Sequence, residues 1–111
     1  MWNGITTLNF AKIVDGMIKN NNFKTYIQHV LPKDEVSKYE LLLYFKNYFN
    51  VDVVIEESNS SNSVNRTLKT QNQDNNLKLW RDAGYKSVPT IEENIKELSE
   101  SDITKGILNN I

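Results

Sequence analysis

The segment SVNRTLKT, residues 63–70, contains the side chain in this sequence that is best suited to bind an anion. Arg66 lies there between two small polar residues, Asn65 and Thr67, and its planar guanidinium can donate two parallel hydrogen bonds to one phosphate group. A solvated loop arginine is the competing interpretation, and composition alone does not choose between the two. We expect Leu68 to be buried and to hold this loop against the core.

Few other residues are suited to catalysis. The chain has no cysteine, which excludes disulfides, thiolate metal sites and thiol nucleophiles, and its single histidine, His29, cannot form an ordinary zinc site alone. The four glycines are too dispersed to form a phosphate-binding loop. None of the tyrosines has a lysine four residues later, so a Tyr/Lys proton-transfer pair cannot form on one helix face. We therefore predict no catalytic residue and no metal site.

Length and charge limit the classes of protein and partner. The 111 residues are enough for one small domain, and the net charge of −1 provides no basic surface for nucleic acid or an anionic membrane. No apolar run is long enough to cross a bilayer, and the first ten residues, MWNGITTLNF, lack the features of a secretory signal. We expect a cytoplasmic protein with neither nucleic acid nor a membrane as partner.

Apolar periodicity and capping signals predict four helices. Ser37 followed by Glu40, and Thr90 followed by Glu93, have the spacing of capping boxes, in which each side chain bonds the backbone of the other residue. Gly84 is placed to end a helix in the left-handed conformation. The predicted helices cover residues 7–19, 38–49, 77–84 and 91–99. The acidic residues of the last helix, Glu97 among them, are interpreted as a solvated face.

Two segments rich in β-forming residues, 26–30 and 51–57, predict strands, and residues 3–6 resemble the end of a third. The polar segment 58–76 is long for a loop in a compact domain, which is typical of a binding loop or of disorder. The predicted fold class is therefore mixed α/β (α+β), with a small sheet of about three strands and four helices packed on it.

Three stretches of the sequence together resemble a known family. They are WNGITTLNFAKIVDGMI, YIQHVLPKDEVSKYELLLYF, and VNRTLKT followed by GYKSVPTIEENIKEL. In order and spacing they are similar to the C-terminal substrate-binding lobe of extended short-chain dehydrogenases, and more narrowly of dTDP-4-dehydrorhamnose reductase-like proteins. The resemblance covers nearly all of residues 2–99 and implies a sugar-nucleotide-binding lobe over residues 1–99. Residues 100–111 are expected to be a frayed C-terminal tail.

The resemblance also implies which domain of a complete enzyme carries the catalytic residues. Such enzymes use NAD(P) to transfer hydride to a dTDP-linked deoxysugar in polysaccharide biosynthesis. Their glycine-rich loop and Tyr-x-x-x-Lys pair belong to an N-terminal Rossmann domain, to which no residue here corresponds. The chain alone is therefore expected to bind no cofactor, to be inactive as a truncated or split enzyme, and to need a Rossmann-domain partner.

The family also suggests a ligand for the loop arginine. By resemblance, Arg66 lies near the diphosphate of the dTDP-sugar, with Asn65 and Thr67 beside it in the substrate site. Relatives often have proline where this chain has Thr67, so the loop departs from the family pattern there. Two alternatives stay open, a non-catalytic regulatory or interaction module that retains the fold and a gene fragment without stable function.

Overall fold

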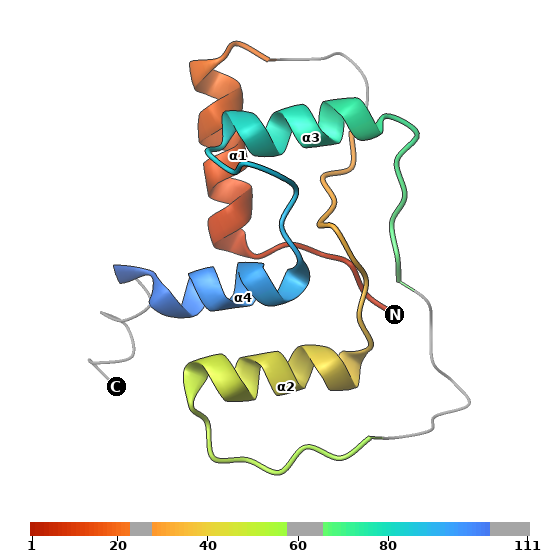
Figure 1. Ribbon diagram of the computed structural model, residues 1–111, viewed down its shortest axis with the longest axis vertical. Coiled ribbons are helices and arrows are strands. Elements are labelled where there is room, and N and C mark those ends of the chain that lie inside the picture. Colours follow the sequence, from red (N-terminus) through yellow and green to blue (C-terminus); the bar gives the residue numbers. More distant parts are fainter. Residues whose placement is uncertain (23–27, 58–65, 103–111) are drawn as a thin grey trace.

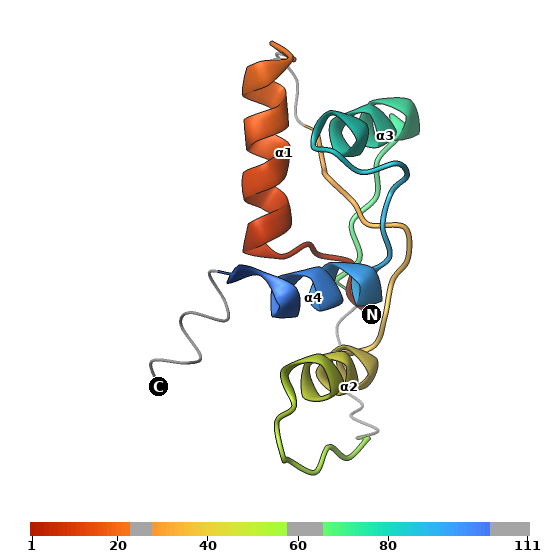
Figure 2. The same ribbon diagram turned by 60° about the vertical axis from the view of Figure 1, so that its left-hand side comes forward.

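The computed structural model describes residues 1–22, 28–57 and 66–102, and the helices in this part of the chain form two pairs. Helix α1 (Thr7–Lys19) packs against α3 (Gln73–Asp82), and α2 (Lys38–Phe49) packs against α4 (Ile91–Glu100). Figure 1 shows the α1/α3 pair above and the α2/α4 pair below, with α3 crossing α1 and with α2 beside α4. The turned view in Figure 2 shows the same separation into two pairs.

The prediction of an α/β fold with a small sheet is wrong, because the described residues contain no β-strand. Two isolated β-bridges at Trp2 are the nearest equivalent, one antiparallel to Val36 and one parallel to Arg66. Trp2 and Val36 exchange backbone hydrogen bonds of 2.7 and 2.8 Å, and the Arg66 N–H donates to the Met1 carbonyl at 3.0 Å. Three chain segments thus meet around Trp2, but each pairing is too short to form a ladder.

The strand predicted at 26–30 is not formed by residues 28–30, and residues 26 and 27 lie outside the described part. Side chains of α3 instead bond the backbone of Leu31, the next residue along. Asn76 accepts from the Leu31 N–H at 2.9 Å and donates to its carbonyl at 3.1 Å, and the Trp80 indole N–H donates to the same carbonyl at 2.8 Å. Because these side chains satisfy the buried backbone groups, this segment does not need a neighbouring strand.

The strand predicted at 51–57 is also absent, although the segment is rich in β-branched residues. Val51 and Val53 are exposed, and Val54 is 87% exposed. β-Propensity largely reports packing on a pleated, half-buried surface, and none of the described segments supplies a paired strand here. The segment instead follows the end of α2 as irregular backbone.

The helix predictions are largely confirmed. The bounds of α1 and α2 agree with those expected, and α4 extends one residue further, to Glu100. Helix α3 begins four residues earlier than predicted, because the Asn72 side chain caps it by accepting from the Asn75 N–H at 3.0 Å. Gly84 has a φ of 104° just beyond the end of α3, as its predicted role requires.

The expected caps form, with one difference. The capping box of Thr90 and Glu93 is complete, and Ser37 accepts from the Glu40 N–H at 3.1 Å. The return bond from the Ser37 backbone to Glu40 is replaced by a contact of 3.2 Å between the Ser37 hydroxyl and the Glu40 carboxylate. Thr6 forms a further capping box with Asn9 at the start of α1.

Each helix pair encloses its own hydrophobic cluster. Ile13, Leu79 and Trp80 are buried between α1 and α3. Gly16 allows the close packing there, since a Cβ at this position would lie only 2.6 Å from the Asp82 carbonyl oxygen. Val36, Ile91 and Ile95 form the second cluster, against which the aromatic face of α2 packs. The described residues therefore form two small cores in place of one core beneath a sheet.

Candidate functional site

The segment that carries Arg66 is held at its backbone. The Arg66 N–H donates to Met1, and Asn3 makes two further hydrogen bonds with the backbone of Leu68. The Leu68 N–H donates to the Asn3 side-chain oxygen at 2.8 Å, and the Asn3 side-chain nitrogen donates to the Leu68 carbonyl at 2.8 Å. Asn3 itself is buried. The N-terminal segment therefore positions residues 66–68.

The expectation that Leu68 is buried is wrong, since its side chain is 46% exposed. The Asn3 amide fixes the segment through the Leu68 backbone, so apolar packing by this side chain is not needed. Of the other predicted ligand residues, Thr67 is partly exposed, and Asn65 lies outside the described residues. The structure therefore places Arg66 and Thr67 together on a fixed segment and does not describe the third member of the set.

The Arg66 side chain is exposed. Among the hydrogen bonds and ion pairs of the described residues, none engages its guanidinium. A guanidinium has five N–H donors in a rigid planar arrangement and no acceptor. The combination of a fixed backbone and an exposed head group is compatible with recognition of a phosphate, although exposure lowers the strength of such a contact.

A second feature is a cavity of about 260 Å³ below the α1 N-terminus, which we call the Trp2 pocket. Asn94, on α4, lines it and is only 2% exposed. Within the described part of the chain, neither its side-chain oxygen nor its side-chain nitrogen has a hydrogen-bond partner, and both atoms are enclosed. The residues lining the Trp2 pocket are Trp2, Gly4, Ile5, Thr6, Thr7, Leu41, Phe45, Ile91, Asn94, Ile95 and Leu98. A buried, unpartnered amide beside a mostly apolar cavity is unusual in folded proteins.

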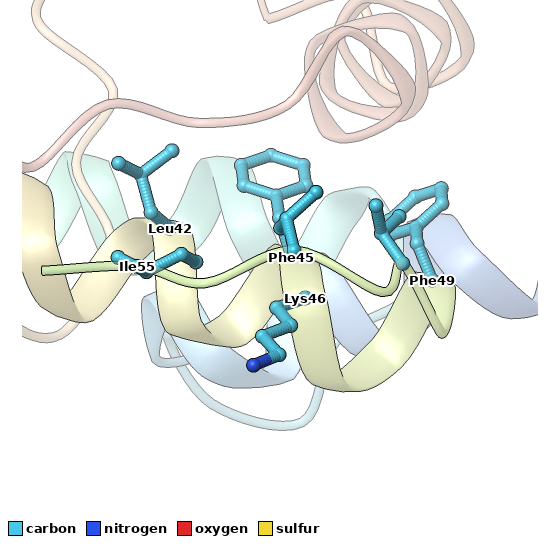
Figure 3. A pocket seen from close by; sticks show the side chains of 7 residues that line it. Leu42, Phe45, Lys46, Phe49 and Ile55 are labelled. Atoms are coloured by element: carbon cyan, nitrogen blue, oxygen red, sulfur yellow. The ribbon is translucent and has the colours of Figure 1, made fainter.

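On the other side of α2 lies an open apolar groove of about 360 Å³, which we call the α2 groove. Helix α2 and the segment after it form this groove, and Figure 3 shows Phe45 and Phe49 on one side of the helix, with the ammonium group of Lys46 directed away from them. The Phe45 and Phe49 rings lie 5.7 Å apart, centre to centre. The residues lining the α2 groove are Leu42, Phe45, Lys46, Phe49, Val51, Val53 and Ile55.

A polar cluster joins α1 to α4, and we call it the polar clasp: Asn9, Lys12, Tyr85 and Glu97. The Tyr85 hydroxyl donates to Glu97 at 2.6 Å, and the Asn9 amide donates to both at 3.0 Å. Lys12 pairs with the other Glu97 oxygen at 2.8 Å. Burial, and then the hydrogen bond to Glu97, raise the pKa of Tyr85 well above its ordinary value of 10.0, so this hydroxyl stays protonated.

The interpretation of Glu97 as part of a solvated face is therefore wrong. Its position on α4 places it beside α1 and Tyr85, where its carboxylate accepts hydrogen bonds from three side chains. Every member of the polar clasp has its partner inside the cluster. The cluster consequently acts as a structural connection between the two helix pairs.

Comparisons of the chain with protein-family models, with curated proteins and with solved structures found no match. Within the described ranges, no group of three or more His, Asp or Glu side chains is arranged to hold a metal ion. None of the helices in the same ranges has both the length and the apolar character to span a membrane.

Sequence reasoning missed the asparagines that organise both candidate sites. Asn3 fixes the Arg66 segment, and Asn94 is a buried residue beside the Trp2 pocket. A signal for Asn94 was present, because it lies three residues after Ile91 and four before Leu98, on the face predicted to be apolar. A signal for Asn3 was not, since its partner lies 65 residues away in the sequence.

Proposed function

We propose that this chain is the substrate-binding part of a sugar-nucleotide oxidoreductase similar to dTDP-4-dehydrorhamnose reductase. In this proposal Arg66 contacts the diphosphate, while a separate Rossmann partner contributes NAD(P) and the catalytic residues. The observation that carries it is the fixing of residues 66–68 by Met1 and Asn3, which leaves the Arg66 side chain exposed. A fixed backbone lowers the entropy lost when the side chain binds a ligand.

The stretches of sequence that carry the resemblance are the other support, and the expected sheet contributes none. WNG at residues 2–4 and RTL at residues 66–68 belong to different parts of the resemblance, and in this structure they are neighbours. Within them, Asn3 bonds Leu68, and Trp2 pairs with Arg66. Two family-like motifs are thus linked by hydrogen bonds around the arginine to which the resemblance assigns the ligand.

The α2 groove supports a second candidate function, a non-catalytic interaction module. Its lining is almost wholly apolar, and the adjoining valines at positions 51, 53 and 54 are exposed. Apolar patches of this kind are often contact surfaces for another protein. In the leading proposal, the Rossmann partner covers the α2 groove; in the alternative, a different protein does so without sugar-nucleotide binding.

The leading proposal is tested by titrating dTDP into the native protein and into Arg66→Ala, with calorimetric detection. Loss of a charge-assisted bidentate contact costs on the order of 1.5–3 kcal/mol, or roughly tenfold to a hundredfold in affinity. Arg66→Lys restores only part of this, because an ammonium keeps the charge without the planar pair of donors. Lys69→Ala is the matched control on the same segment and is expected to have a much smaller effect. Equal dTDP affinities for the native protein and Arg66→Ala would contradict a phosphate contact at Arg66.

A second measurement separates the two candidate functions. With NADPH and dTDP-4-dehydro-6-deoxymannose, the chain alone is expected to show no turnover, and addition of a related Rossmann half is expected to restore it. Turnover by the chain alone would contradict the proposal that a separate Rossmann partner contributes the cofactor and the catalytic residues. Binding to a partner through the α2 groove, abolished by Phe49→Ala and accompanied by no dTDP binding, would favour the interaction module.

A further inference from the structure

We propose that the segment after α2, residues 51–57, binds an extended stretch of a partner protein in which apolar and basic residues alternate. The partner adds as a β-strand beside this segment and covers the open α2 groove. This inference rests on the proposal that another protein covers the groove, and it is independent of ligand binding at Arg66. Three observations carry it: the alternation of the side chains, the unpaired backbone and the acidic charge of the segment.

The side chains of the segment alternate between two sides, as they do in a β-strand. Val51, Val53 and Ile55 line the α2 groove. Asp52 and Val54, which lie between them in sequence, are exposed and are not part of the lining. Figure 3 shows the segment running along α2. Since successive residues of a strand point to opposite faces, the segment has the side-chain arrangement of a strand without a neighbour.

The backbone in the second half of this segment is unpaired. Among the described residues, no backbone N–H or carbonyl group from Val54 to Glu57 has a hydrogen-bond partner. Just before it, the Val53 N–H donates to the Val51 carbonyl at 3.1 Å, within the segment itself. A row of unpaired N–H and carbonyl groups is a template for an added strand, whose main-chain hydrogen bonds provide affinity.

The charges beside this backbone define the partner. Asp52, Glu56 and Glu57 are exposed, and Lys46 is the one cation among the described residues that line the groove. Opposite charges that face each other on neighbouring strands attract, and like charges repel. The favoured partner therefore has one basic residue facing Asp52 and another facing Glu56. Its alternate residues are apolar, because they lie over the groove.

A second copy of this chain is a poor occupant of the same surface. In the antiparallel register that pairs all seven residues of the segment, Asp52 of each copy faces Glu56 of the other. In a parallel, in-register pairing, each acidic residue faces its own counterpart. Both arrangements place like charges opposite each other, which is destabilising. Charged residues on an exposed edge are a common means of preventing association of identical chains.

The test uses the heptapeptide VKVTVKV, amidated at its C-terminus and labelled with fluorescein at its N-terminus. In an antiparallel pairing its two lysines face Asp52 and Glu56, and its threonine faces Val54. Fluorescence anisotropy is followed as native protein is added, and we expect saturable binding. The peptide VEVTVEV has the same alternation with acidic residues and is expected to bind at least about tenfold more weakly. The same loss is expected for VKVPVKV, which lacks one N–H donor and disfavours a strand.

Two substitutions at one position test the backbone contribution. Val54→Pro removes an N–H from the unpaired row, whereas Val54→Thr keeps the N–H and the β-branched side chain and is the matched control. The Val54 side chain is 87% exposed, so neither change removes packing from the core. We expect Val54→Pro to weaken VKVTVKV binding at least about tenfold and Val54→Thr to leave it unchanged.

The contribution of charge is tested by the double variant Asp52→Lys with Glu56→Lys. It is expected to reverse the preference, so that VEVTVEV binds more tightly than VKVTVKV. Equal affinities of the native protein for the two peptides would overturn the proposal. Absence of saturable VKVTVKV binding at millimolar concentration would overturn it as well, as would a dimer in sedimentation equilibrium that Val54→Pro dissociates.

Hydrogen exchange separates strand addition from simple docking on the groove. Bound VKVTVKV is expected to protect the amide protons of alternate residues between Val54 and Glu57, because alternate N–H groups of a strand point to one edge. Binding that is weakened by Phe49→Ala and not by Val54→Pro would overturn strand addition and leave the groove as a contact surface. Arg66→Ala is expected to leave peptide binding unchanged, so failure of the dTDP proposal and failure of this one are distinguishable.

Discussion

The two helix pairs bury their side chains to different degrees. In the α1/α3 pair, Trp80 is fully buried, its indole N–H is bonded to Leu31, and its ring meets Tyr85 edge-on at 5.0 Å. In the α2/α4 pair, no residue of α2 is buried, and α2 borders both the Trp2 pocket and the α2 groove. The interface between α1 and α3 is thus closed, although Phe10, Val14 and Ile18 on the rest of α1 are exposed. In the lower pair, α2 borders two apolar pockets.

Two asparagines show the same contrast. Asn76 and Asn94 are each 2% exposed, one on α3 and one on α4. The Asn76 side chain forms hydrogen bonds with both backbone polar groups of Leu31, whereas the Asn94 amide has no partner among the described residues. The two asparagines are therefore equally buried but differ in role. Asn76 holds the backbone at Leu31 against α3, and Asn94 lies beside the Trp2 pocket.

The largest effect is expected from Trp80→Ala. Removing a fully buried tryptophan creates a cavity and leaves the Leu31 carbonyl with one donor fewer, at a cost of roughly 3–5 kcal/mol in the free energy of unfolding. Phe45→Ala in the lower pair is the comparison and is expected to cost roughly 1–2 kcal/mol, since its ring is only partly buried. Urea denaturation followed by circular dichroism measures both. Equal costs would remove the distinction between a closed and an open pair.

An intermediate effect on the free energy of unfolding is expected when each of the two asparagines, Asn76 and Asn94, is replaced by leucine, with opposite signs at the two positions. Asn76→Leu leaves the buried Leu31 N–H without its acceptor and is expected to lower the free energy of unfolding by about 1–3 kcal/mol. Asn94→Leu breaks no bond and is expected to raise it. The same denaturation experiment on both variants decides the matter. Destabilisation by both substitutions would indicate that Asn94 has a structural partner.

The smallest effect concerns alkaline pH. The raised pKa of Tyr85 means that its contribution to stability is complete below pH 10 and falls as the pH rises above that value, because the unfolded chain loses this proton first. Between pH 10 and 11 the loss is up to about 1 kcal/mol. Tyr85→Phe lacks this titration, so its stability should fall less over the same interval.

Tyr48→Phe is the matched variant in the lower pair. The pKa of Tyr48 is also raised, by partial desolvation and then by its hydrogen bond to Glu92, but this contact lies at the surface. Its replacement should therefore change the alkaline slope less than Tyr85→Phe does. Stability measured by denaturation at pH 8, 10 and 11 tests the order, and a larger change for Tyr48→Phe would contradict the role given to the polar clasp.

The helices could be predicted from sequence because their determinants are local. The capping box of Thr90 and Glu93, and the cap at Ser37, join residues three apart, and the apolar stripes recur within one helix. Gly84 likewise acts within its own turn. The largest error was at the start of α3, because its first turn, QDNN, is polar and was interpreted as loop.

The strands were mispredicted because β-structure depends on a partner that the sequence pattern does not name. The backbone at Leu31 found its partners in the side chains of Asn76 and Trp80, 45 and 49 residues away. The segment 51–57 found no paired strand among the described residues. Residues with high β-propensity form strands only where a neighbouring backbone completes the ladder.

For the candidate sites, the sequence by itself determined the residue types, a guanidinium at position 66 and an amide on the apolar face of α4. Only the tertiary structure decided that Asn3 fixes the Arg66 segment, that the Leu68 side chain is exposed, and that the Asn94 amide is buried without a partner among the described residues. The physical reason is that a side chain's hydrogen-bonding capacity is inherent in its chemistry, whereas its partners are set by long-range packing between segments far apart in the chain.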